Sequence, residues 1–219
     1  MQISLSLQKI HLERKMINLN SLNNIPINSD VLKALLSNLK YPKNKISDLE
    51  KAGELIRLKK DLYVRKSNNI SKELIANHLY GVSYVSLETA LSFYGMIPER
   101  VHAIRSMTTK RAKSFKTPLG NFEYKTVSVD YFNIGIRQEI VENQYAFLIA
   151  EPTKAVCDMI VTTPNLRLQS VKAMRNYLTK DLRIDFEDLE LLDKAIVKQC
   201  INMGKKKGEL KYLLRFLEE

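Results

Sequence analysis

The segment Leu55–Val64 constrains the fold most strongly, because it predicts a β-hairpin directly after two helices. Two short apolar runs flank the polar triplet Lys59-Lys60-Asp61, which is typical of a hairpin turn. Upstream, a helix is expected from Ser29 or Asp30 to about Leu39. A second helix is expected at 42–53, because proline suits the first helical turn and glycine the end. The order helix, turn, helix, hairpin predicts a winged helix-turn-helix module.

Basic residues are concentrated in the same part of the chain. The net charge of the whole chain is +11, which suits a polyanionic partner such as nucleic acid. Residues 1–70 hold thirteen Lys and Arg and six Asp and Glu, a net charge of +7, and the remainder contributes only +4. We therefore expect a basic DNA-binding domain at 1–68, which includes a short N-terminal helix near 7–18. A nearly balanced domain at 69–219 would follow.

The second helix and the hairpin carry the residues that we expect to contact DNA. In a winged helix the second helix enters the major groove and the hairpin lies along the phosphates. Asn44 is suited to reading an adenine edge, whereas the cations mainly position the protein. The expected contacts are Lys40, Tyr41, Lys43, Asn44, Lys45, Ser47, Arg57, Lys59, Lys60 and Arg65. A solvated surface on a protein-interaction module would explain the same lysines.

The remainder predicts a mixed α/β domain with a helical C-terminal tail, so the whole chain falls in the α+β class. Helices are expected at 71–79, 86–95, 152–161, 168–179, 186–202 and 209–217, and strands at 101–108, 121–129, 134–141 and 145–150. The last strand, Tyr145–Ala150, is continuously apolar, which predicts burial on both faces.

A basic run, Thr109–Lys116, is expected to form a loop between two strands. Its cations would contact nucleic acid or an acidic face of a partner protein, or else form a solvated hairpin tip. These cations are Lys110, Arg111, Lys113 and Lys116.

Three segments together resemble the AbiEi-type antitoxins of type IV toxin–antitoxin systems. They are Leu55–Val64, Ser83–Pro98 and Glu151–Ile160, and the resemblance covers about half of the chain. Thr153 stands where the family usually has Glu, and Asp61 where the hairpin usually has Gly. The resemblance implies a winged-helix domain that represses its own operon. It also implies a C-terminal domain that counteracts a nucleotidyltransferase-like toxin.

Catalytic patterns are weak. Glu123-Tyr124-Lys125 matches half of a metal-dependent nuclease site, but no Asp lies between Asp61 and Asp130 to share the metal. The glycine-rich phosphate loops are missing, and Cys157 and Cys200 are expected to be buried free thiols rather than zinc ligands. We expect no enzyme activity, no cofactor and no metal.

The sequence thus predicts a cytoplasmic, antitoxin-like transcriptional repressor without a membrane span. It would bind double-stranded operator DNA, as two copies if the operator is an inverted repeat, and a nucleotidyltransferase-like toxin. Two alternatives stay open. One is a solitary winged-helix regulator whose second domain is a sensor or dimeriser, and the other is a metal-dependent nuclease.

Overall fold

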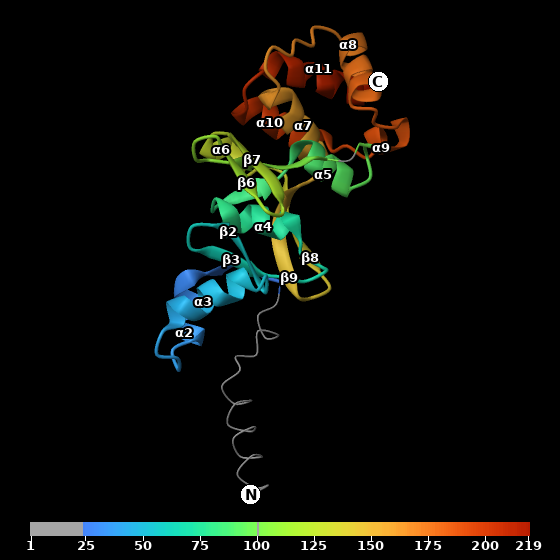
Figure 1. The fold of residues 1–219 in the computed structure, drawn as a ribbon. Coiled ribbons are helices and arrows are strands. Elements are labelled where there is room, and N and C mark those ends of the chain that lie inside the picture. The colour runs from blue at the N-terminus through green and yellow to red at the C-terminus, as the bar shows by residue number, and fades with distance from the viewer. Residues whose placement is uncertain (1–23, 100) are drawn as a thin grey trace, which may run out of the picture. The chain divides into compact units, whose positions relative to one another are not determined.

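The computed structural model describes residues 24–99 and 101–219, and this chain divides into two compact units. The first unit runs to Ser71 and includes Thr117–Leu119, and the second comprises Lys72–Lys116 and Gly120–Glu219. Each unit contains both helices and a sheet, so the expected α+β class is confirmed (Figure 1). The helix expected near residues 7–18 lies outside the described residues.

The described part of the first unit contains two helices and a three-stranded sheet. In chain order these are β1 (Ile27–Asn28), α2 (Ser29–Leu35), α3 (Pro42–Lys51), β2 (Leu55–Lys59) and β3 (Leu62–Arg65). The strands lie in the order β1-β3-β2 with antiparallel pairing throughout. The expected helices and hairpin are present. However, α2 ends at Leu35 rather than near Leu39, because the chain turns at Leu36 and packs that side chain into the core.

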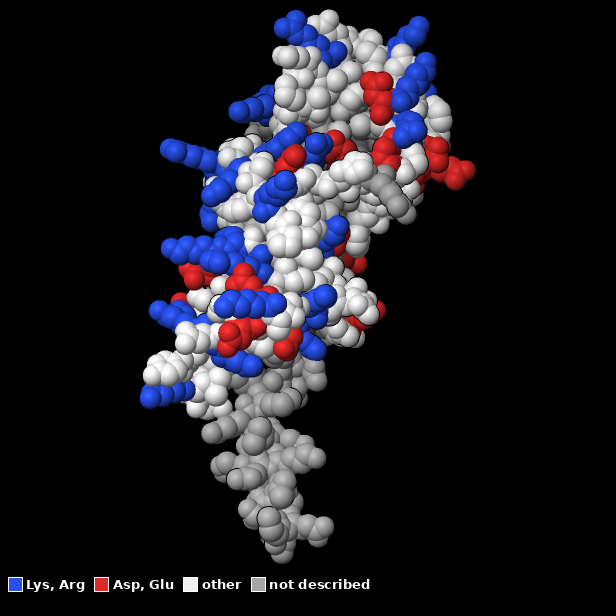
Figure 2. Space-filling model, in the orientation of Figure 1, with Lys and Arg blue, Asp and Glu red and all other residues white. Residues whose placement is uncertain are grey.

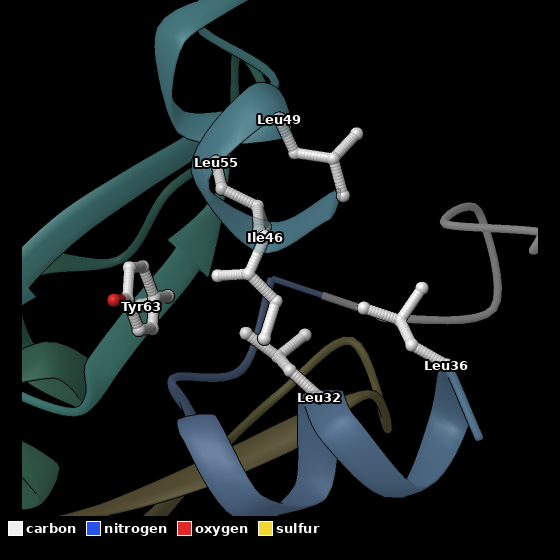
Figure 3. Close-up of a cluster of buried hydrophobic side chains, with 6 residues drawn as sticks. All are labelled: Leu32, Leu36, Ile46, Leu49, Leu55 and Tyr63. Carbon is white, nitrogen blue, oxygen red and sulfur yellow. The ribbon is translucent and has the colours of Figure 1, made fainter. Parts of the chain in front are cut away.

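A small apolar core holds these elements together (Figure 3). Leu32 of α2 and Leu36 at its C-terminal cap are spaced i and i+4, and Ile46 and Leu49 of α3 are spaced i and i+3, so each pair lies on one face. The cluster consists of Leu32, Leu36, Ile46, Leu49, Leu55 and Tyr63. Burying an aliphatic side chain of this size contributes roughly 1.5–3 kcal/mol. The core therefore determines which face of α3 is turned away from the protein.

A six-stranded mixed sheet forms the centre of the second unit. Its strands are β4 (Ser83–Val85), β5 (Ala103–Thr108), β6 (Lys113–Thr117), β7 (Gly120–Thr126), β8 (Ile136–Val141) and β9 (Tyr145–Ala150). They lie in the order β6-β7-β5-β4-β9-β8. The β4–β9 and β5–β7 pairs are parallel, whereas β4–β5 and β8–β9 are antiparallel.

Helices cover both faces of this sheet and form the C-terminal tail. They are α4 (Lys72–Leu79), α5 (Leu87–Phe93), α6 (Val129–Phe132), α7 (Pro152–Thr162), α8 (Val171–Asn176), α9 (Phe186–Glu190), α10 (Lys194–Met203) and α11 (Lys207–Glu218). Alternation along β7 shows which helix lies on which face. The buried Tyr124 donates a hydrogen bond to α4, whereas its neighbour Lys125 faces the opposite way and donates to Thr162 of α7.

Three expectations about the second unit were wrong. The basic run at 109–116 is not wholly a loop, because Lys113–Thr117 forms the edge strand β6. The helix expected at 186–202 is broken between α9 and α10, where the Asp193 carboxylate accepts a hydrogen bond from the backbone N–H of Ala195 and caps a new helix. Strand β9 is not buried along its whole length, because Tyr145, Ala146 and Leu148 are only half-buried.

Three short elements were not anticipated. They are strand β1 (Ile27–Asn28), strand β4 (Ser83–Val85) and helix α6 (Val129–Phe132). None is long enough to show a periodic pattern. No helix in the described ranges is long and apolar enough to cross a membrane.

Candidate nucleic-acid interface

The outward face of α3 carries the polar residues that the sequence assigned to DNA. Ile46 and Leu49 are buried in the core of the first unit. Lys43, Asn44 and Lys45 are exposed, and Ser47 is half-buried. The packing of α3 thus presents an amide and two ammonium groups to solvent together.

The N-terminal end of α3 is basic and lacks an acidic side chain in its first turn. Pro42 occupies the first helical position, where its missing N–H costs no helical hydrogen bond. Lys40 lies just before it, with its Nζ atom 5.4 Å from the centre of the Tyr41 ring. Tyr41 is 61% exposed, so its ring is not buried against this helix. The partial positive charge of a helix N-terminus adds to these lysines.

The β2–β3 hairpin adds further cations on the same unit. Arg57, Lys59 and Lys60 are exposed, and Arg65 is half-buried. The guanidinium of Arg57 lies over the ring of Tyr63 on the partner strand, 5.9 Å from its centre. This contact orients one cation along the sheet.

Asp61 fixes the tip of the hairpin against α2. Its φ of 61° is the left-handed conformation that glycine adopts freely and that Asp tolerates better than most residues. The backbone C=O of Asp61 accepts a hydrogen bond of 3.0 Å from the N–H of Ser29. Its carboxylate accepts a second one, of 3.1 Å, from the Ser29 hydroxyl. The hairpin turn is therefore tied to the start of α2.

Carboxylates are interspersed with the cations of the first unit. Figure 2 shows Asp and Glu side chains among the Lys and Arg side chains. Asp48 is exposed on α3 itself, and Asp30 of α2 forms an ion pair of 2.7 Å with Lys33. Among the described residues of this unit, the first turn of α3 is a place where exposed lysines have no acidic residue beside them on the same turn.

The basic run of the second unit is organised around an aromatic cluster. The rings of Tyr80, Phe115 and Tyr124 contact one another with centres 5.1–5.8 Å apart. Lys110 donates a hydrogen bond to the Tyr80 carbonyl, and Lys113 lies over the rings of Tyr80 and Phe115. Arg111 and Lys116 are exposed. Lys110 and Lys113 therefore serve packing as well as charge.

Glu123, the carboxylate of the nuclease alternative, belongs to a chain of ion pairs. Arg105 of β5 contacts Glu88 of α5 at 2.5 Å and Glu123 of β7 at 3.1 Å. Burial alone would lower the pKa of Arg105, but the two carboxylates outweigh it and the pKa is raised. Glu123 is therefore already paired with a guanidinium rather than left free to bind a cation. In the described parts of the chain, no three His, Cys, Asp or Glu side chains are placed to hold a metal ion.

A buried polar network joins two of the segments that carry the family resemblance. Lys154 Nζ lies 3.0 Å from Asp158 Oδ1 on α7, and both side chains have no exposed surface. Asp158 Oδ2 accepts hydrogen bonds from the Ser86 hydroxyl at 2.7 Å and from the Tyr84 hydroxyl at 3.0 Å. Lys154 also donates to the Tyr131 carbonyl at 3.1 Å.

This network is sealed from solvent, so it is structural rather than a binding site. Burial and the neighbouring Asp158 raise the pKa of Tyr84 well above its usual value. Leu87, which follows Ser86, is fully buried with a φ of 58°, a strained conformation for a bulky side chain. Beside the network, Cys157 and Cys200 are buried free thiols. A hydrogen bond to Cys200 and burial raise the pKa of Cys157, which keeps it protonated at neutral pH.

No protein-family model matches this chain, and no curated protein matches it.

Proposed function

We propose that the chain is a DNA-binding transcriptional regulator whose first unit is a winged helix-turn-helix. Helix α3 is the recognition helix and the β2–β3 hairpin is the wing. One observation carries this proposal: the core of the first unit holds the apolar face of α3 inward, and Lys43, Asn44 and Lys45 are exposed at its N-terminal end. A major groove would receive this end, and Asn44 is its one side chain suited to bidentate contact with adenine.

In this proposal, the cations of α3 and those of the hairpin contact different parts of the DNA backbone. Lys40, Lys43 and Lys45 neutralise phosphates beside the groove, while Arg57, Lys59 and Lys60 follow the backbone along the wing. Such contacts supply affinity and make it dependent on salt, and they carry little sequence information. Tyr41 and Ser47 add neutral contacts. Two copies of the chain would meet an inverted repeat.

The second unit gives the proposal its antitoxin part. The segments that resemble AbiEi-type antitoxins lie mostly in this unit, and two of them meet through Asp158. We propose that the protein represses its own operon in the cytoplasm and counteracts a nucleotidyltransferase-like toxin without being an enzyme. Lys110, Arg111, Lys113 and Lys116 are offered as contacts to nucleic acid or to an acidic face of that toxin.

A gel-shift titration tests the DNA-binding part. The probe is the DNA upstream of the chain's own gene, and the variant Lys43→Glu/Lys45→Glu reverses the charge at the start of α3. The control Lys172→Glu/Lys198→Glu makes the same change in net charge at exposed positions of the second unit. We expect at least a hundredfold loss of affinity for the first variant and little loss for the control. Equal loss in both would show that only net charge matters.

Gene neighbourhood and co-expression test the antitoxin part. A nucleotidyltransferase encoded beside this gene should arrest growth when expressed alone, and co-expression of this chain should restore growth. If co-expression of this chain does not relieve the growth arrest, the alternative of a solitary regulator is favoured. Cleavage of DNA with Mg²⁺ that Glu123→Ala abolishes would instead support the nuclease.

A further inference from the structure

The second unit contains a cavity of about 500 Å³ beyond the end of β7. Its lining comes from four places: the end of β7 with the turn into α6 and α6 itself, the last turn of α7, the connection between α10 and α11, and Ala112 before β6. The main contributors are Lys125, Val127, Ser128, Val161, Thr162 and Lys205. This volume lies within the range of small-molecule sites, roughly 300–1,000 Å³.

The charged residues that line this cavity are all basic. Among the described residues that line it, two are lysines and none is acidic. Lys125 is half-buried and donates a hydrogen bond of 3.4 Å to the neutral hydroxyl of Thr162. Burial and the nearby Arg105 lower the pKa of Lys125, and the charges of Glu88 and Glu123 do not fully offset them. An anion beside this ammonium group would compensate for its desolvation.

The other walls suit an apolar or aromatic body. Val127 and Val161 supply aliphatic surface, and Tyr131 and Gly204 also line the cavity. A Cβ atom built on Gly204 would lie 2.8 Å from the Tyr131 ring, so the backbone of the α10–α11 connection packs directly against that ring. The hydroxyls of Ser128 and Thr162 lie among these walls and can bond to sugar hydroxyls.

We infer that this cavity binds a nucleoside monophosphate, with the phosphate on Lys125 and Lys205, the ribose at Ser128 and Thr162, and the base against the apolar walls. The cavity volume, the pair of lysines without an acidic neighbour in the lining, and the aromatic edge together favour this ligand. The inference concerns the second unit alone and does not rest on DNA binding by the first.

Thermal unfolding of the full-length protein tests this inference. The probes are AMP, GMP, CMP and UMP, with the matching nucleosides and inorganic phosphate as separate arms at constant ionic strength. At least one nucleotide should raise the unfolding temperature by about 3 °C for each tenfold increase in concentration above its Kd. The rise should vanish in Lys125→Met/Lys205→Met and persist in Lys180→Met/Lys198→Met, which alters two exposed lysines elsewhere in the unit.

Single substitutions keep the test decisive if the double variant does not fold. Lys205 is exposed, and Lys205→Met alone should weaken nucleotide binding at least tenfold. No rise with any nucleotide overturns the inference. An equal rise in wild type and in Lys205→Met also overturns it, because the ligand would then bind elsewhere. If inorganic phosphate alone gives the full rise, the site takes an adventitious anion and the nucleotide assignment is wrong.

Discussion

At the scale of single residues, the clearest feature is the buried pair of Lys154 and Asp158. A buried ion pair is tolerated only when its remaining polar atoms are bonded, because desolvating two charges costs several kcal/mol for each ion. Here Tyr84 and Ser86 donate to Asp158, and Lys154 donates to a backbone carbonyl. The pair thus connects β4, α6 and α7, and this explains why the two resembling segments carry polar residues inside a core.

Removing one member of this pair should destabilise the second unit strongly. Lys154→Met leaves the Asp158 carboxylate buried without its cation, and we expect a loss of about 3–5 kcal/mol in the free energy of unfolding. The double variant Lys154→Met/Asp158→Leu removes both charges and should recover much of that loss. Urea denaturation followed by circular dichroism measures both. A single variant within about 1 kcal/mol of wild type would mean that the pair is not an essential part of the core.

Sequence alone could not reveal this network. Lys154 and Asp158 are spaced i and i+4 on a helix, a pattern that on average indicates an exposed salt bridge. Because Lys and Asp are almost never fully buried, the sequence gives no reason to predict that both side chains lie in the core. Their partners Tyr84 and Ser86 lie some seventy residues away along the chain, and only the tertiary structure brings them together.

At the scale of elements, the β2–β3 hairpin shows how much local patterning predicts. Its two strands and its polar tip were expected from two short apolar runs around a polar triplet, and they appear within about one residue of the expected limits. What the pattern could not show is the tie between Asp61 and Ser29, which links the turn to a helix more than thirty positions earlier.

Substitution of Asp61 should therefore loosen the hairpin. Asp61→Ala loses the bond to the Ser29 hydroxyl and forces alanine into a left-handed conformation that costs about 1–2 kcal/mol. Asp61→Asn keeps a side-chain oxygen and tolerates that conformation, so it should be nearly neutral. Hydrogen exchange at the backbone amides of β2 and β3 reports the difference. Equal protection in wild type and Asp61→Ala would show that the tip does not depend on this residue.

The wrong predictions for residues 109–116 and 186–202 have a common physical reason. Lys113–Thr117 has the composition of a loop, yet it pairs at the edge of the sheet, where lysines are tolerated because one side faces solvent. Between α9 and α10 the apolar stripe of Leu189, Leu192 and Ile196 continues at helical spacing. A capping bond at Asp193 nevertheless interrupts the helix. Edge pairing and capping depend on geometry that a periodic pattern does not contain.

At the scale of the whole molecule, the change in charge density along the chain predicts a boundary after residue 68. The first compact unit of the structure runs to Ser71 and includes Thr117–Leu119, and the second comprises Lys72–Lys116 and Gly120–Glu219. The core of the second unit includes four buried tyrosines, namely Tyr84, Tyr124, Tyr131 and Tyr177, a feature that the charge count did not reveal.

These tyrosines predict alkaline instability of the second unit. Burial raises the pKa of Tyr84, Tyr124 and Tyr131, and it raises the pKa of Tyr177 to about 12. The folded unit therefore keeps protons that the unfolded chain releases near pH 10. Stability should be full below pH 10 and fall as the pH rises from 10 to 12, by about 1.4 kcal/mol per pH unit for each such tyrosine.

Chemical denaturation between pH 9 and 11.5 measures this slope, and absorbance near 295 nm follows phenolate formation. Tyr124→Phe removes one titrating group and should reduce the slope of the unfolding free energy by about 1.4 kcal/mol per pH unit. A free energy of unfolding that stays constant between pH 9 and 11 would contradict the burial of these hydroxyls.

The salt dependence of DNA binding tests the central claim most directly. If Lys40, Lys43, Lys45, Arg57, Lys59 and Lys60 each neutralise a phosphate, the logarithm of the binding constant should fall with the logarithm of salt concentration with a slope of roughly −5.4. In Lys43→Ala/Lys45→Ala the slope should shrink by about 1.8. An unchanged slope in this variant, or binding that does not respond to salt, would contradict the assignment of α3 as the DNA-reading helix.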